Sequence, residues 1–102
     1  SLEEDPLQCA KRELHEETGY RAEQYRKILT IATTVGFSNE YIHIYLAENL
    51  TAGQQETDDD EFVNVVKMPF ADALAKVKNG EIFDAKTVAA ILYFANEAKV
   101  RR

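Results

Sequence analysis

The chain has 102 residues and a formal net charge of −6, and both numbers limit what it can be. A chain of this length suits one domain rather than two. Apolar residues make up 45% and charged residues 29%, proportions that indicate a folded globular protein and not a disordered one. The negative charge repels phosphate backbones and argues against broad nucleic-acid binding, whereas divalent cations still allow an acidic protein to bind a small phosphate substrate.

The cysteine content and the hydropathy pattern indicate in which cellular compartment the protein is expected. Cys9 is the single cysteine, so an intrachain disulfide is excluded and a reducing cytoplasm is expected. No apolar run approaches the roughly 20 residues that cross a bilayer, so no membrane partner is expected. The first residue, Ser1, is not methionine, and the lack of a leader segment therefore carries no weight.

The first predicted element is a helix from Asp5 to Thr18. Asp5 is a favourable N-cap, and Pro6 suits the first helical turn because its missing N–H has no partner there. Gly19 suits the position just after the last turn, where the backbone commonly takes a left-handed conformation. An apolar stripe along one face predicts that this helix packs against a sheet.

Three strands are predicted to follow, over 25–33, 41–47 and 62–68. The second is the clearest, because its sequence Tyr-Ile-His-Ile-Tyr-Leu-Ala is rich in aromatic and β-branched residues. A polar loop separates the second strand from the third and ends in an acidic run, which comprises Asp58, Asp59, Asp60 and Glu61.

Two helices are predicted to end the chain, over 70–78 and 85–99. Asn79 and Gly80 end the first, and Asp84 is the predicted N-cap of the second, whose apolar residues follow helical spacing. The order of helix, three strands and two helices predicts the α/β class, with an α+β mixed sheet, in a single domain over 1–102.

Three glutamates on the first predicted helix are the main functional signal. Glu13, Glu16 and Glu17 fall within about 100° of one another around the helix axis, so their charges repel. A divalent cation removes this repulsion and gains several oxygen ligands, and oxygen-only ligation favours Mg²⁺ or Mn²⁺ over Zn²⁺. A solvated acidic face is the commoner explanation of such a cluster on its own. His15 and His43 are expected to be structural.

The residues around these glutamates favour the functional explanation. The segment Arg12-Glu13-Leu14-His15-Glu16-Glu17-Thr18-Gly19-Tyr20 resembles the C-terminal half of the Nudix box at every fixed position of that motif. The full box also has a glutamate eight residues before the arginine, where Glu4 stands, although the neighbouring Glu3 and Asp5 leave its register open. The glycine that opens the box would fall before Ser1.

This resemblance implies roles that are carried over by position. It implies a loop–helix–loop that binds Mg²⁺ or Mn²⁺ through Glu13, Glu16 and Glu17, with Glu16 and Glu17 also counted as catalytic. Arg12 would orient a box carboxylate through a charge-assisted hydrogen bond, the alternative being a plain surface salt bridge. It further implies a partial Nudix fold, an α/β/α sandwich that lacks its N-terminal strands, and a homodimer. Because open sheet edges invite pairing, we expect this chain to be a dimer or larger with weak or no activity of its own.

Beyond the box, the chain resembles the ADP-ribose pyrophosphatase branch of the family, in 34–47, 58–66 and 79–87. In that branch an acidic residue on the loop before the last strand helps to activate water or ligate metal, so Asp59 and Glu61 join the catalytic candidates; a solvated loop is the alternative. The resemblance implies Mg²⁺-dependent hydrolysis of a small-molecule nucleoside diphosphate derivative, ADP-ribose, to AMP and ribose 5-phosphate. The alternatives are another nucleotide sugar, a dinucleotide, or a non-catalytic acidic interaction domain.

Overall fold

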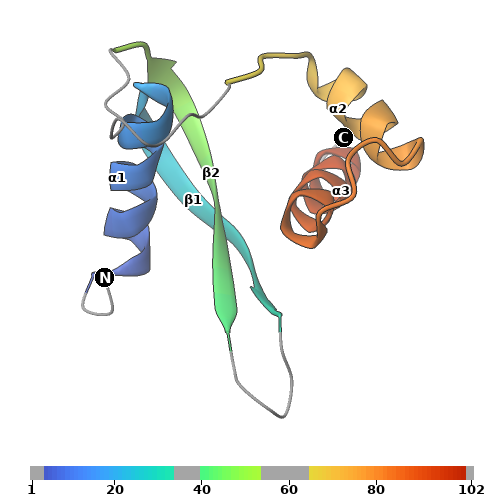
Figure 1. Cartoon of the computed structure of the whole chain (residues 1–102), viewed down its shortest axis with the longest axis horizontal. Helices are drawn as coiled ribbons and strands as arrows, with labels where there is room; N and C mark the ends of the chain where they lie inside the picture. The colour runs from blue at the N-terminus through green and yellow to red at the C-terminus, as the bar shows by residue number, and fades with distance from the viewer. Residues whose placement is uncertain (1–3, 34–39, 54–64, 101–102) are drawn as a thin grey trace. The chain divides into compact units, whose positions relative to one another are not determined.

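The structure is a computed structural model and describes residues 4–33, 40–53 and 65–100. In chain order its elements are helix α1 (Pro6–Thr18), strand β1 (Arg21–Ala32), strand β2 (Tyr41–Thr51), helix α2 (Phe70–Lys78) and helix α3 (Ala85–Val100) (Figure 1). Strands β1 and β2 pair into a two-stranded antiparallel sheet. The predicted mixed α/β class is therefore confirmed.

The chain divides into two compact units, each built from two segments. The first unit contains Ser1–Lys27 and Tyr45–Val66, and so holds α1 and the base of the β1–β2 hairpin. The second contains Ile28–Ile44 and Lys67–Arg102, and so holds the far part of the hairpin with α2 and α3. That the whole chain acts as one domain stays a prediction.

Helix α1 is capped by the residues that the sequence predicts. The Asp5 carboxylate accepts hydrogen bonds from the backbone N–H of Leu7 at 3.1 Å and of Gln8 at 3.4 Å. These N–H groups have no partner within the helix, and the cap supplies one. Gly19 follows the helix with φ of 79° and donates its N–H to the carbonyl of His15 at 2.8 Å. Glycine adopts this left-handed conformation without steric cost.

Two side chains of α1 make further contacts. Thr18 stabilises the C-terminal end of the helix, and Lys11 contacts β1. The Thr18 hydroxyl donates to the carbonyl of Leu14 at 2.6 Å and accepts from the N–H of Tyr20 at 3.0 Å. The Lys11 ammonium lies 5.4 Å from the centre of the Tyr25 ring, a cation–π distance, so the helix is held against β1.

Both strands extend beyond their predicted ends, at the same end of the hairpin. The sequence predicts strands over 25–33 and 41–47, whereas β1 begins at Arg21 and β2 runs to Thr51. The added residues are mostly polar or exposed and have weak strand propensity by themselves. Each strand supplies hydrogen-bond partners to the other, and this pairing extends the ladder past the apolar core of each strand.

Side chains also pair across the far part of the hairpin. The Thr33 N–H donates to the Glu40 carbonyl at 2.9 Å, and the Thr33 hydroxyl donates to the Glu40 carboxylate at 2.6 Å. The Thr30 hydroxyl lies 3.0 Å from Nδ1 of His43. These cross-strand contacts fix the register of β1 against β2.

The third predicted strand, over 62–68, is wrong for the part that the structure describes. Val65, Val66 and Met68 lie in a segment without regular structure, and Val66 is 70% exposed. A strand forms only where a neighbour completes its backbone hydrogen bonds, and the described sheet contains β1 and β2 alone. Apolar composition thus predicted a strand for which the described chain offers no partner. Residues 62–64 lie outside the described residues.

Helices α2 and α3 match the predicted ranges closely. Asp84 caps α3 by accepting the N–H of Thr87 at 3.1 Å. Phe70 of α2 and Phe94 of α3 meet edge to face with ring centres 5.0 Å apart, which packs the two helices together. In the turn between them, the Glu81 carboxylate accepts hydrogen bonds from two donors at 2.9 Å each, the Lys76 ammonium and the Asn79 side-chain amide.

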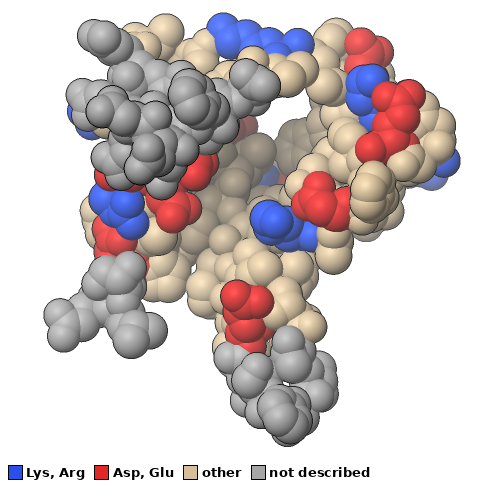
Figure 2. Space-filling view, viewed as in Figure 1, with Lys and Arg blue, Asp and Glu red and all other residues tan. Residues whose placement is uncertain are grey.

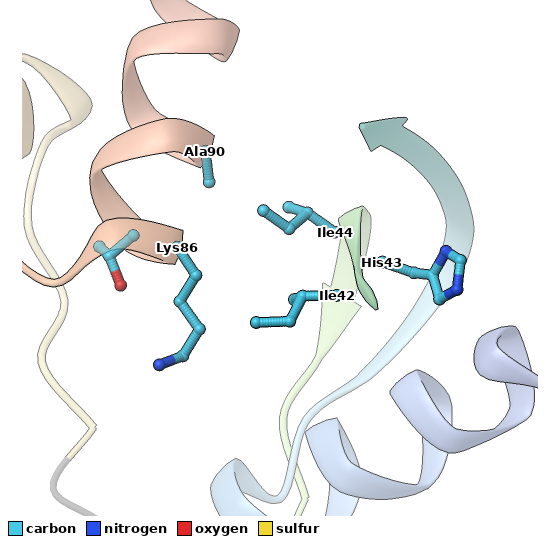
Figure 3. Close-up of a pocket in the computed structure, with 6 residues that line it drawn as sticks. Ile42, His43, Ile44, Lys86 and Ala90 are labelled. Atoms are coloured by element: carbon cyan, nitrogen blue, oxygen red, sulfur yellow. The ribbon is translucent and has the colours of Figure 1, made fainter. Parts of the chain in front are cut away.

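Within the second unit, β2 and α3 line an open cavity of about 340 Å³ (Figure 3). Ile42 and Ile44 point toward α3, while His43 points to the opposite face of the strand. The α3 side of the cavity is lined by Lys86, Thr87 and Ala90. No carboxylate is among the residues that line this cavity, so none of the predicted metal ligands lies there.

Apolar burial is shallow throughout the described residues. None of their apolar side chains is fully buried, and Phe83 is 83% exposed. Gly19 is the one described residue classed as buried. No helix in the described ranges is long and apolar enough to cross a membrane. Capping and turn contacts therefore carry more of the local order than a closed core does.

The cap of α1 yields a stability prediction. Replacing Asp5 with alanine removes the acceptor for two N–H groups, so the free energy of unfolding should fall by about 1 kcal/mol. Asp5→Asn keeps an acceptor of similar reach and should remain close to wild type. Urea denaturation followed by circular dichroism measures both variants, and equal midpoints for Asp5→Ala and Asp5→Asn would contradict the assigned cap.

Candidate functional site

The predicted site residues that the structure describes lie on α1. Arg12, Glu13, Glu16 and Glu17 all belong to this helix, and acidic and basic side chains lie next to one another over it, at the left of Figure 2. A single continuous helix therefore presents every charged residue of the matched box segment. Its capped ends hold these side chains at fixed spacings along the axis.

Arg12 is bonded to two carboxylates at once. Its Nε donates to one Glu4 oxygen at 3.1 Å and its Nη2 donates to the other at 2.9 Å, which is a bidentate pair. Its Nη1 donates to Glu16 at 2.9 Å. A planar guanidinium makes such a fork with defined geometry, which an ammonium group cannot copy. The expected hydrogen bond from Arg12 to a box carboxylate is present, and the carboxylate is Glu16.

These ion pairs orient side chains more than they stabilise the fold. The side chains of Arg12 and Glu16 are 43% and 45% exposed, and exposed pairs contribute little to stability. The hydrogen bond from Arg12 lowers the pKa of Glu4, and Glu4 in turn raises the pKa of Arg12. Arg12 therefore favours the ionised form of Glu4 and orients the Glu16 carboxylate through its hydrogen bond.

Cys9 lies beside this cluster but has the wrong electrostatics for a nucleophile. Its side chain is partly buried, 3.8 Å from Nη2 of Arg12. Loss of water raises the pKa of its thiol, and the negative charges of Glu13 and Glu4 raise it further. A thiol with a raised pKa is protonated at neutral pH and reacts slowly.

The box glutamates fit a divalent cation by their chemistry, although their side chains do not form a cage. Carboxylate oxygens are the ligands that Mg²⁺ and Mn²⁺ prefer. In the described ranges, no three His, Cys, Asp or Glu side chains converge so as to hold a metal ion. Arg12 instead holds Glu16 through the hydrogen bond from its Nη1. The metal roles of Glu13, Glu16 and Glu17 stay predictions.

The two candidates of the acidic loop, Asp59 and Glu61, lie outside the described residues. The nearest described residue before them is Gly53, which lies against the end of α1 at Gly19. Their proposed part in the reaction therefore stays a prediction from sequence.

The structure adds one residue to the candidate site, Glu4. The sequence left open whether Glu4 or a neighbour occupies the first glutamate position of the box. In the structure Asp5 caps the helix, while Glu4 forms the bidentate pair with Arg12. The signal in the sequence was the spacing of eight residues between Glu4 and Arg12.

The sequence of this chain is similar to known proteins over most of its length. A family model described as the NUDIX domain matches residues 2–91. The chain is 46% identical over 92 residues to the ADP-ribose pyrophosphatase of Bacillus subtilis (strain 168), a match that covers 88% of this chain and 50% of that protein.

Further relatives carry different names. The chain is 42% identical over 92 residues to the methanol dehydrogenase activator of Bacillus methanolicus, covering 88% of this chain and 50% of that protein. It is 39% identical over 89 residues to the GDP-mannose pyrophosphatase of Cronobacter sakazakii (strain ATCC BAA-894), covering 84% of this chain and 47% of that protein. The chain thus spans about half the length of the curated relatives it matches.

The Arg12 pairs yield a prediction about titration. Because the hydrogen bond from Arg12 lowers the pKa of Glu4, the pair contributes stability above the ordinary pKa of glutamate, and this stability is lost as pH falls through the lowered value. In Arg12→Gln, the pKa of Glu4 should rise toward its ordinary value, and Arg12→Lys should shift it only in part. Carbon-13 NMR titration of the glutamate carboxyls measures this.

Glu81 provides the internal control for that titration. Its pKa is lowered by a different donor, the Lys76 ammonium, which does not belong to the Arg12 cluster. It should titrate identically in wild type and in both Arg12 variants. A Glu4 pKa that does not move in Arg12→Gln would show that the bidentate pair is absent in solution.

Proposed function

This chain belongs to the Nudix family, and from that membership we propose that the protein hydrolyses the pyrophosphate bond of ADP-ribose to AMP and ribose 5-phosphate, with Mg²⁺ or Mn²⁺. The observation that carries the proposal is the charged face of α1, where Arg12 holds Glu16 beside Glu13 and Glu17. The 46% identity to a relative named ADP-ribose pyrophosphatase supports the choice of substrate.

The chemistry needs a bound cation and an acceptor for a proton. When bound, the divalent ion neutralises charge on the pyrophosphate and lowers the pKa of a coordinated water. Glu13, Glu16 and Glu17 would supply its oxygen ligands, and Arg12 would orient Glu16 through its hydrogen bond. Asp59 or Glu61 accepts the proton of the attacking water. The water oxygen bonds to one phosphorus, and the bridging oxygen leaves with the electron pair on the other phosphate.

The choice of substrate has an alternative, because relatives that match this chain over similar lengths act on different molecules by name. GDP-mannose pyrophosphatase relatives support another nucleotide sugar as that alternative. A non-catalytic interaction domain is the alternative of another class. Against it stands the match to the box, because this chain keeps the box glutamates Glu13, Glu16 and Glu17 together with Arg12.

The box glutamates yield the main activity prediction. In the intact protein, Glu16→Gln combined with Glu17→Gln should lower kcat on ADP-ribose by on the order of 1,000-fold, because metal ligation supplies several kcal/mol of transition-state stabilisation. The matched control combines Glu23→Gln with Glu48→Gln, which removes the same charge from exposed positions on β1 and β2. The control should keep wild-type kcat.

A melting experiment separates a catalytic protein from an interaction domain. Mg²⁺ or Mn²⁺ should raise the melting temperature of wild type and of the control, since a ligand that binds only the folded state stabilises it. The double box variant should show no such rise. Wild-type turnover in the double box variant would overturn the proposed activity, and an equal metal shift in all three proteins would overturn the assigned ligands.

We further propose that the protein is a homodimer in a reducing, cytoplasmic compartment. Shallow apolar burial in the described residues supports the dimer, because exposed side chains such as Tyr41 and Phe83 gain from a partner surface. The single cysteine supports the compartment. Sedimentation equilibrium should give twice the monomer mass, independent of reducing agent. A monomer at micromolar concentration would contradict the dimer.

A further inference from the structure

Two side-chain contacts join α1 to β1 within the first compact unit. Nη2 of Arg21 lies 3.2 Å from Nε2 of His15, and the Lys11 ammonium lies 5.4 Å from the centre of the Tyr25 ring. A guanidinium group can only donate hydrogen bonds, so Nε2 of His15 is the acceptor. All four residues belong to Ser1–Lys27, one segment of the unit. The contacts therefore tie the helix of the box to the strand that follows it.

The two contacts follow the periods of a helix and a strand. Lys11 and His15 are four residues apart on α1 and share a face of the helix, while Arg21 and Tyr25 are four apart on β1 and share a face of the strand. His15, nearer the end of α1, contacts Arg21, nearer the start of β1. This order is expected for a strand that runs back along the helix. One face of α1 is thus held against one face of β1.

The box glutamates lie on the other side of the helix. At about 100° per residue, the midpoint of Lys11 and His15 lies roughly 170° around the axis from the midpoint of the box glutamates. Gly19 and Tyr20 link α1 to β1, and their torsion angles are soft, so side-chain contacts are needed to fix the rotation of the helix. A rotation of about 10° moves a carboxylate at a radius of roughly 6 Å by about 1 Å. The contacts with β1 therefore determine where the carboxylates point.

We propose that Arg21 is a positioning residue, whose hydrogen bond to His15 fixes the rotation of α1 and so directs the glutamates on its opposite face. The inference rests on the proposed function, because it assumes that these glutamates hold the metal ion. His15 directly precedes Glu16, so its bond to β1 acts on the turn that carries two of the three ligands. Loss of the bond misplaces the metal ligands and leaves other substrate contacts untouched. Turnover should therefore suffer more than substrate binding.

The first test is Arg21→Gln in the intact protein. At saturating Mg²⁺, kcat on ADP-ribose should fall by about 10-fold, because a misplacement near 1 Å costs up to about 100-fold, while KM changes little. The dissociation constant of Mn²⁺, measured by electron paramagnetic resonance without substrate, should rise by about 10-fold, since groups that orient metal ligands affect affinity on this scale. Lys27→Gln is the matched control, because it removes the same charge from an exposed position on β1. It should keep both wild-type values.

A double-mutant cycle tests whether Arg21 acts through His15. His15→Phe removes the acceptor and should lower kcat as much as Arg21→Gln, and the two changes together should lower it no further, because they remove the same bond. His15→Gln supplies an amide oxygen as acceptor and should stay close to wild type. Additive losses in the double variant would overturn the inference. So would wild-type kcat and Mn²⁺ affinity in Arg21→Gln with only the melting temperature lowered, which is the result expected of a purely structural bond.

Failure of this inference can be told apart from failure of the proposed function. The Mn²⁺ measurement uses no nucleotide, so the comparison of Arg21→Gln with Lys27→Gln tests the positioning role whichever nucleotide is the substrate. Wild-type Mn²⁺ affinity in Arg21→Gln, with affinity lost in the Glu16→Gln and Glu17→Gln double variant, would overturn the positioning role alone. Unchanged Mn²⁺ affinity in that double variant would overturn the proposed ligands and this inference with them.

Discussion

Repulsion among carboxylates on one helix face is the constraint on which the rest of the structure depends. Glu13, Glu16 and Glu17 share α1, and each unneutralised pair at these spacings opposes helix formation. Arg12 offsets part of this repulsion by holding Glu16 and Glu4. Carboxylates gathered in this way are the ligands that a divalent cation, and through it a pyrophosphate, would use.

Local signals in the sequence predicted local structure well. Asp5, Gly19 and Asp84 are cap residues whose partners lie within a few positions along the chain, and the structure places each at the helix end that the sequence predicts. Non-local structure was harder to predict. The strand over 62–68 fails in its described part because a strand depends on a neighbour, which no local pattern supplies.

In the candidate site, too, the local features were predictable from the sequence and the non-local contacts were not. Helical spacing placed the three glutamates on one face, and the resemblance to the box singled them out together with Arg12; the structure shows one continuous helix through all four. The pairing of Glu4 with Arg12 needed the structure, since the chain before the helix has no periodicity to fix it. The approach of Gly53 to Gly19 joins positions 34 residues apart, and only coordinates reveal it. The roles of Asp59 and Glu61 stay predictions.

The names of the relatives bear on whether the box would select the diphosphate or the whole substrate. Relatives named for ADP-ribose and for GDP-mannose match this chain over nearly the same length. If α1 holds metal ions as proposed, it would recognise the diphosphate that both molecules contain and would not distinguish the base or the sugar.

The central claim is that the carboxylates of α1 hold a divalent ion. Anomalous diffraction from crystals of the intact protein grown with Mn²⁺ locates such an ion directly. We expect an anomalous peak within about 2.3 Å of oxygen atoms from at least two of Glu13, Glu16 and Glu17. Manganese bound elsewhere, with these three side chains directed into solvent, would contradict the claim.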